Sequence, residues 1–142
     1  MTTFQKLLIR GRKYYRTNKR IRAKMLKVLM RAYYHCDIPF EAKLDDTVYF
    51  CHAGFGTVIH PSVEIGSETV IQHRVTIGER GGGVPHIGKK CFIGAGAIII
   101  GPIVIGDYAR IGAGAVVIND VHSGDTVVGV PASLKRKEND YE

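Results

Sequence analysis

The sequence predicts a mainly β protein built as a parallel solenoid, because an aliphatic residue returns every six positions through its centre. These residues are Ile59, Ile65, Ile71 and Ile77, followed after a break by Ile87, Ile93, Ile99, Ile105, Ile111 and Val117. An α-helix repeats about every 3.6 residues and a strand alternates about every two, so neither pattern explains this spacing. Residues 93–97 recur as residues 111–115, which makes one coil eighteen residues long. Such coils bury their aliphatic face only by stacking on one another.

Glycines fall where this repeat requires tight corners. They directly follow the aliphatic residue at Gly66, Gly78, Gly88, Gly94, Gly106 and Gly112. Glycine permits unusual backbone angles at such corners. A flexible linker would also be rich in glycine, but it would lack phased isoleucine and bury no apolar surface. Beyond Val117 we expect the repeat to end, with a turn at residues 119–120.

The positive charge of the chain is concentrated at its N-terminus. Eleven lysines and arginines and no acid precede Asp37, whereas nine bases face thirteen acids from Asp37 onward. The pattern of residues 4–34 predicts two helical segments that meet near Thr17 and Asn18. Either of these two residues can cap the second segment. One face of the second segment carries Ile21, Met25, Val28, Leu29 and Ala32.

Three interpretations of this basic amphipathic region remain open. We favour packing of its apolar side on the solenoid or on a neighbouring subunit, with the bases solvated. Attraction of residues 4–34 to an anionic membrane surface or an anionic glycan precursor is the second interpretation. Nucleic-acid binding is disfavoured because no recognised binding motif accompanies the charge.

The remaining composition predicts a cytoplasmic protein, possibly peripheral at the inner face of a membrane. No apolar run approaches the length of a membrane span, and no signal-peptide pattern is evident. Cys36, Cys51 and Cys91 are odd in number and lack metal-ligand spacing, which predicts free thiols and no metal site. The predicted organisation is a basic amphipathic segment (1–35), a solenoid (36–134) and a charged tail (135–142).

The repeat is interrupted twice, and each interruption contains a histidine. Phe50 and Ile59 are nine residues apart, with His52 in the excess, and ten residues separate Ile77 from Ile87, with His86 among them. Loops that leave a regular scaffold often carry function. A neutral imidazole can take a proton from an attacking hydroxyl, and a nearby carboxylate improves it by fixing its orientation.

Residues 37–38, 52–53, 56–59 and 75–78 resemble the active-site region of serine acetyltransferases, which are hexapeptide-repeat acyltransferases with a left-handed parallel β-helix fold. The resemblance extends from about Asp37 to Ala132. It implies that His52 is the general base and that Asp37, fifteen residues earlier, orients it. His86 corresponds to a second family histidine that helps to form the acceptor site. The histidines without such a match, predicted to be structural or solvated, are His35, His60, His73 and His122.

The same resemblance implies acetyl-CoA as co-substrate, bound in a groove between the subunits of a homotrimer. The matching corner residues are Gly94, Ala95, Gly112 and Ala113. Val130 and Pro131 match a C-terminal contact with the nucleotide end, and Lys135 and Arg136 would meet the phosphates. Transfer through Cys51 is disfavoured because neighbours in a strand point to opposite faces.

The chain departs from the family pattern at the residues that grip serine. The family has an aspartate before the first histidine and an arginine before the second, whereas this chain has Cys51 and Pro85. It also lacks the long N-terminal helical domain of the family. The loss of these charged partners should weaken the binding of a zwitterionic acceptor more than the binding of an uncharged one. We therefore expect an O-acetyltransferase acting on a capsule, lipopolysaccharide or related saccharide; the alternatives are a serine O-acetyltransferase and a non-catalytic β-helix scaffold.

Overall fold

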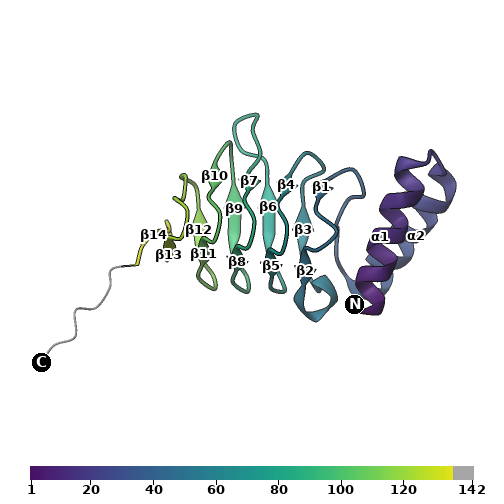
Figure 1. Cartoon of the computed structure of the whole chain (residues 1–142), viewed down its shortest axis with the longest axis horizontal. Coiled ribbons are helices and arrows are strands. Elements are labelled where there is room, and N and C mark those ends of the chain that lie inside the picture. The colour runs from purple at the N-terminus through teal and green to yellow at the C-terminus, as the bar shows by residue number, and fades with distance from the viewer. Residues whose placement is uncertain (136–142) are drawn as a thin grey trace, which may run out of the picture.

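The computed structural model describes residues 1–135, which form a helical hairpin followed by a column of stacked short strands. Helices α1 (Thr3–Arg16) and α2 (Arg20–Tyr34) lie together at one end of the column, and the chain leaves at the other end (Figure 1). The two predicted helical segments are therefore confirmed.

The strands form a three-faced solenoid, and each face is one sheet. Face A contains β3 (Val58–Ile59), β6 (Thr76–Gly78), β9 (Ile98–Ile100) and β12 (Val116–Val117). Face B contains β1 (Lys43–Leu44), β4 (Glu64–Ile65), β7 (His86–Ile87) and β10 (Val104–Ile105). Face C contains β2 (Tyr49–Phe50), β5 (Val70–Ile71), β8 (Phe92–Ile93), β11 (Arg110–Ile111), β13 (Thr126–Val128) and β14 (Ser133–Leu134).

Equivalent aliphatic residues of successive coils stand directly over one another inside the column. On face C, for example, Ile71 pairs in parallel with Ile93, and Ile93 pairs with Ile111. Parallel strands lie roughly 4.8 Å apart, so these side chains are in contact from coil to coil. Ile71 and Ile93 are 0% exposed and Ile111 is 1% exposed. The predicted parallel β-helix and its inward-facing residues are confirmed.

The column continues beyond Val117, where the regular six-residue spacing ends. Val121 bridges Ile105, and β13 places Val127 beside Ile111 in parallel register. Each of these partners is sixteen residues away instead of eighteen, because the corner after Val117 is two residues shorter. The shortened corner breaks the six-residue spacing without ending the stack. The antiparallel pairing of β14 with β13 then closes this end of face C.

Helix α1 covers the open end of the first coils with apolar side chains. Thr2 and Gln5 form a capping box at its start. Phe4 is 1% exposed, and its ring meets the Phe50 ring edge-on, with the centroids 6.0 Å apart. The absence of a side chain at Gly11 makes room for Phe40, since a Cβ there would lie 2.1 Å from the end of the Phe40 ring.

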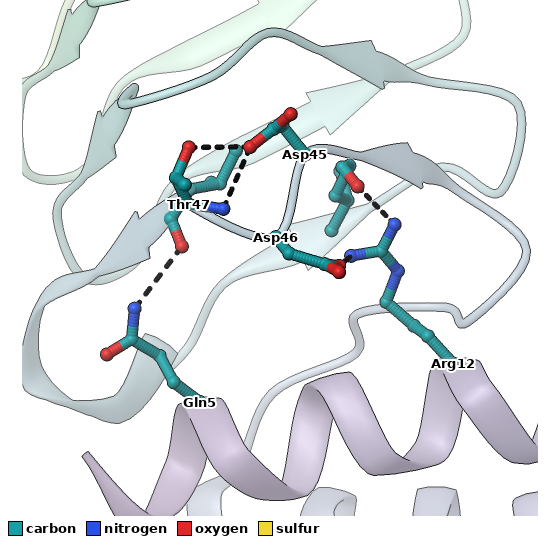
Figure 2. A network of polar contacts seen from close by, with 7 residues as sticks. Gln5, Arg12, Asp45, Asp46 and Thr47 are labelled. Carbon is teal, nitrogen blue, oxygen red and sulfur yellow. Dashed lines mark hydrogen bonds and ion pairs between the residues drawn. The ribbon is translucent and has the colours of Figure 1, made fainter. Parts of the chain in front are cut away.

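Polar contacts from the same face of α1 fix the helix to the turn between β1 and β2 (Figure 2). The Arg12 guanidinium donates to the Leu44 carbonyl and pairs with Asp46 Oδ1 at 2.7 Å. Gln5 Nε2 donates to the Val48 carbonyl at 3.4 Å. Arg12 is only 2% exposed, and its burial lowers its pKa. The expectation that the N-terminal bases are all solvated is therefore wrong for Arg12.

Helix α2 differs from the sequence prediction in its cap and in its buried face. Its N-cap is Lys19, which makes no side-chain capping bond, and Asn18 adopts a left-handed conformation within the turn. The buried residues are Ala23 and Met30, whereas the face that contains Met25 and Leu29 is exposed to solvent. The expected packing of that face on the solenoid does not occur within this chain.

Replacing Arg12 by alanine should lower the free energy of unfolding by about 2–3 kcal/mol, because a buried carbonyl and Asp46 lose a charged donor. Chemical denaturation of the variant measures this loss. The matched control is Arg16→Ala, since Arg16 lies on the same helix but is exposed, and it should change stability by less than about 0.5 kcal/mol. Equal effects of the two substitutions would mean that the Arg12 contacts contribute nothing net.

Candidate functional site

The candidate site lies along one edge of the solenoid, where each face C strand ends and the chain turns toward face A. We call this edge the C–A corner; it comprises residues 51–57, 72–74, 94–96 and 112–114 of successive coils, and 129–130 beyond them. Backbone bonds link these turns: Gly96 N donates to the His73 carbonyl at 3.0 Å, and Gly114 N donates to the Ala95 carbonyl at 2.9 Å. The corner is therefore a continuous column that rises through the molecule.

The predicted base, His52, lies in the first turn of this corner. The interruption, three residues longer than a regular corner, contains a short 3-10 segment, η1 (Cys51–Gly54), in which His52 and Ala53 have φ values of 50° and 52°. Non-glycine residues in this left-handed region cost about 1 kcal/mol or more. Regular corners of the column contain such residues singly, at Glu68, Arg74, Lys90 and Tyr108, whereas His52 and Ala53 are two in succession. The His52 side chain is exposed to solvent. The interruption thus directs an imidazole outward at the corner.

A second histidine, His73, lies beside His52. The two rings meet edge to face at 89°, with their centroids 5.0 Å apart. The Nδ1 atom of His73 is buried and has no hydrogen-bond partner within the part of the chain that the structure describes. The sequence analysis treated His73 as structural or solvated. The signal it missed is spacing: His73 follows His52 by twenty-one residues, one coil plus the three-residue insertion, as Phe50 and Ile71 do in register.

Asp37, the predicted partner of His52, is hydrogen-bonded through its backbone to Thr57 and Ile59, which follow the His52 turn. Its N–H donates to the Thr57 carbonyl at 2.8 Å, and its carbonyl accepts from Ile59 N at 2.9 Å. Its carboxylate lies 3.6 Å from Arg31 Nη2 of α2. Within residues 1–135 no hydrogen bond joins the Asp37 carboxylate to His52, so the orienting role of Asp37 stays a prediction.

His86 lies on face B, away from the C–A corner. It begins β7, and its Nδ1 is 3.3 Å from Glu64 Oε2 on the preceding coil. A hydrogen bond from Lys43 lowers the pKa of Glu64 against the opposing effect of desolvation, with smaller contributions from the charges of Lys43 and His86. The structure does not bring His86 to His52 within one chain. A joint site would require His86 of a neighbouring subunit.

The small residues predicted to contact coenzyme A occupy the C–A corner in the coils after His73. A Cβ on Gly94 would lie 2.5 Å from Ala113 N, so the close approach of two coils requires glycine there. Ala95 is half-buried and Ala113 is exposed, so the surface of the corner carries only small side chains at these positions. Val130 and Pro131 are exposed in the turn after β13, and Lys135 follows β14. Arg136 lies outside the described residues.

The Cys51 thiol, next to His52, is poorly suited to act as a nucleophile. Burial raises its pKa, although a hydrogen bond with Gln72 acts in the opposite direction. The thiol therefore stays protonated at neutral pH, and the thiolate is the reactive form. Cys36, Cys51 and Cys91 are all free, as predicted. Among residues 1–135, no three His, Cys, Asp or Glu side chains are grouped so that they could hold a metal ion.

A parallel solenoid with one hexapeptide on each face defines the class of hexapeptide-repeat proteins, and comparisons agree. The bacterial transferase hexapeptide (six repeats) family matches residues 85–119. The serine acetyltransferase of Helicobacter pylori strain J99 is 38% identical over 120 residues, which are 82% of this chain and 70% of that protein. The Mycobacterium tuberculosis serine acetyltransferase is also 38% identical, over 69% of this chain and 44% of that protein.

Solved structures give the same answer. The crystal structure of Neisseria gonorrhoeae serine acetyltransferase superposes with a TM-score of 0.81 and 36% identity, covering 92% of this chain and 51% of that chain. A serine acetyltransferase in complex with CoA superposes with a TM-score of 0.80 and 33% identity, covering 88% of this chain and 52% of that chain. The chain belongs to the serine acetyltransferase-like branch of the hexapeptide-repeat acyltransferases. It spans about half the length of the two structures compared.

Alkylation of Cys51 by iodoacetamide should be slower than that of free cysteine at neutral pH, because its raised pKa leaves less thiolate. The rate should rise with pH and approach that of free cysteine only above the ordinary thiol pKa. Mass spectrometry of the modified peptide measures it, with Cys51→Ser as the control for reaction at the other cysteines. A Cys51 more reactive than free cysteine at neutral pH would revive a covalent mechanism.

Proposed function

We propose that this chain transfers an acetyl group from acetyl-CoA to a hydroxyl group, with His52 as general base. The observation that carries the proposal is the outward-directed His52 at the one solenoid corner that continues as a strip of small residues. Family membership supports the reaction, and the relative in complex with CoA supports the donor.

The proposed reaction is a direct transfer. The acceptor oxygen attacks the thioester carbonyl carbon while His52 takes the hydroxyl proton. The resulting tetrahedral oxyanion accepts hydrogen bonds from backbone N–H groups or from His86 of a neighbouring subunit. The C–S bond then breaks, and the leaving sulfur recovers the proton from the His52 imidazolium. Asp37 would turn from Arg31 toward His52 to stabilise that imidazolium.

His73 would be a positioning residue for His52 in this reaction. Its ring packs edge-on against the His52 ring, and its backbone is tied to the next coil through Gly96. A base that must meet a proton at hydrogen-bond distance loses efficiency when it is displaced by about an ångström. The contact would therefore restrict the His52 ring to the geometry that transfer needs.

The pantetheine arm of acetyl-CoA would follow the C–A corner away from His52. Gly94, Ala95, Gly112 and Ala113 offer backbone groups and little side-chain bulk along this path. Val130 and Pro131 would meet the nucleotide end, with Lys135 and Arg136 near its phosphates. A homotrimer would place the corner of one subunit against the next, which would bring in His86.

L-serine is the leading acceptor, because the named relatives are serine acetyltransferases and one relative was solved in complex with serine. Arg74, exposed directly after His73, is a candidate partner for its carboxylate. A saccharide hydroxyl is the second candidate, and one observation favours it. Cys51 and Pro85 replace the two charged residues with which the family grips a zwitterion. The comparisons favour serine over this earlier expectation.

An acceptor panel tests the proposal with the purified full chain. Free CoA released from acetyl-CoA is measured with L-serine, with amino-group and carboxyl-blocked serine, and with neutral mono- and disaccharides. We expect turnover of L-serine that falls when either charged group is blocked. The variant His52→Ala should lose turnover while CoA binding by calorimetry stays within about threefold of wild type, because the base contacts only the reacting atoms.

Each other outcome of the panel has a definite meaning. Turnover of saccharides without turnover of serine would replace the leading acceptor by the second candidate. CoA binding without turnover of any acceptor, or full activity of His52→Ala, would contradict the proposed mechanism. Absence of CoA binding would favour the scaffold.

Replacing His73 by alanine should lower kcat by about tenfold to a hundredfold, with little change in the KM for acetyl-CoA, because His52 loses its positioning contact. The pH–rate profile should change shape, and His73→Gln should recover part of the rate. The control is His60→Ala, since His60 lies outside the corner and its side chain accepts a hydrogen bond from the nearby Ser62 N–H. A lower melting temperature with unchanged kcat and pH profile would reduce His73 to a structural residue.

A further inference from the structure

Helix α2 carries a second apolar face that nothing in this chain covers. Its inner face, with Ala23, Leu26 and Met30, packs inside the hairpin. On the opposite side of the helix lies what we call the outer face of α2. Its large side chains and their exposed fractions are Ile21 77%, Met25 69%, Val28 61%, Leu29 58% and Tyr33 73%. A helix that is apolar on two sides normally has a partner on each.

Every charged residue of α1 and α2 is basic. Two acids of the following segment adjoin the α2 flank: Asp37 lies 3.6 Å from Arg31, and Glu41 borders the same hollow as Lys24 and Lys27. Arg20, Lys24, Lys27 and Arg31 run along one flank of α2, Arg22 lies on the other flank, and Arg10 of α1 borders the groove beside it. Residues 1–36 contain no acid. The first turn of α2 has bases and no acid, although a helix dipole disfavours positive charge there. These bases therefore do not stabilise the N-terminus of α2, but they would attract an anionic partner.

We propose that the outer face of α2 binds the surface of a lipid bilayer that contains anionic phospholipid. Amphipathic helices insert an apolar face at the boundary between headgroups and acyl chains, while flanking bases meet anionic headgroups. Such a surface offers an apolar layer that can bury the exposed side chains of this face and negative charge that can pair with its flanking bases. In the described part of the chain neither helix is long and apolar enough to cross a bilayer, so the proposed contact is at the surface.

A second copy of the chain fits this surface less well. Joining two outer faces would bring together two segments that each hold eleven bases and no acid before Asp37. The acids from Asp37 onward exceed the bases only thirteen to nine, so another part of a second copy offers little compensation. The hairpin lies at one end of the column, and contact through α2 leaves the later coils of the C–A corner uncovered (Figure 1). The proposal does not depend on the acetyltransferase activity.

Flotation of the full chain with vesicles tests this proposal. We expect binding to vesicles of phosphatidylcholine with phosphatidylglycerol, little binding to phosphatidylcholine alone, and release at high salt. The double variant Met25→Glu and Leu29→Glu should bind at least about tenfold more weakly, because two apolar contacts are replaced by charges. The matched control is Val104→Glu on face B, where Val104 is 53% exposed, and it should bind as wild type does.

Further measurements separate the proposal from its competitors. Circular dichroism should show unchanged helix content in the double variant, and release of CoA from acetyl-CoA should match wild type. Equal binding to both kinds of vesicle would overturn the proposal, since charge would then play no part. Wild-type binding by the double variant would also overturn it, since charge alone would then suffice. So would an absence of vesicle binding together with a lower oligomeric mass of the double variant in sedimentation, which would make the outer face a contact between copies.

Discussion

The register of stacked coils is the constraint on which the rest of this structure depends. Each face has room for one inward aliphatic residue per coil, and the residues that line up, such as Ile71, Ile93 and Ile111, are almost completely buried. Extra residues cannot enter a strand without moving every later side chain to the wrong face. They must therefore leave the ladder at a corner. The position of the proposed base follows from this, because the insertion after β2 places His52 outward while the stack continues undisturbed.

The two ends of the column solve different problems. At the N-terminal end α1 supplies Phe4 and Leu8 to cover the first coils, and Arg12 bonds groups that the first turn leaves unpaired. At the other end a shortened corner and the antiparallel β14 complete face C. Exposed sheet ends invite association, so both ends need such covers. Helix α2 packs on this end only through its inner face and Arg31, so its outer face stays exposed.

The candidate site combines a conserved kind of chemistry with altered surroundings. His52 and the small residues of the C–A corner fit the acetyl transfer of the family, whereas Cys51 and Pro85 change the charges near the acceptor. His73 and Arg74 enter the same corner from the next coil. Within one fold, substrate specificity depends on residues around the reacting groups, because they can contact the acceptor without changing the reaction. Under the proposed function, a few side chains around this corner would decide the acceptor.

The sequence by itself determined the solenoid, its eighteen-residue coil, the two helices and the position of His52, because these depend on local spacing. It did not reveal His73 beside His52, since the insertion moves equivalent residues twenty-one positions apart. The six-residue spacing stops at Val117 although the column continues, because the next corner is two residues shorter. The sequence also could not assign α2 its buried face, because two apolar stripes compete on one helix. Only the tertiary structure decided that His86 lies on face B with Glu64. For α2 and His86 the outcome depends on which surface packs against which, and spacing along the chain does not encode that choice.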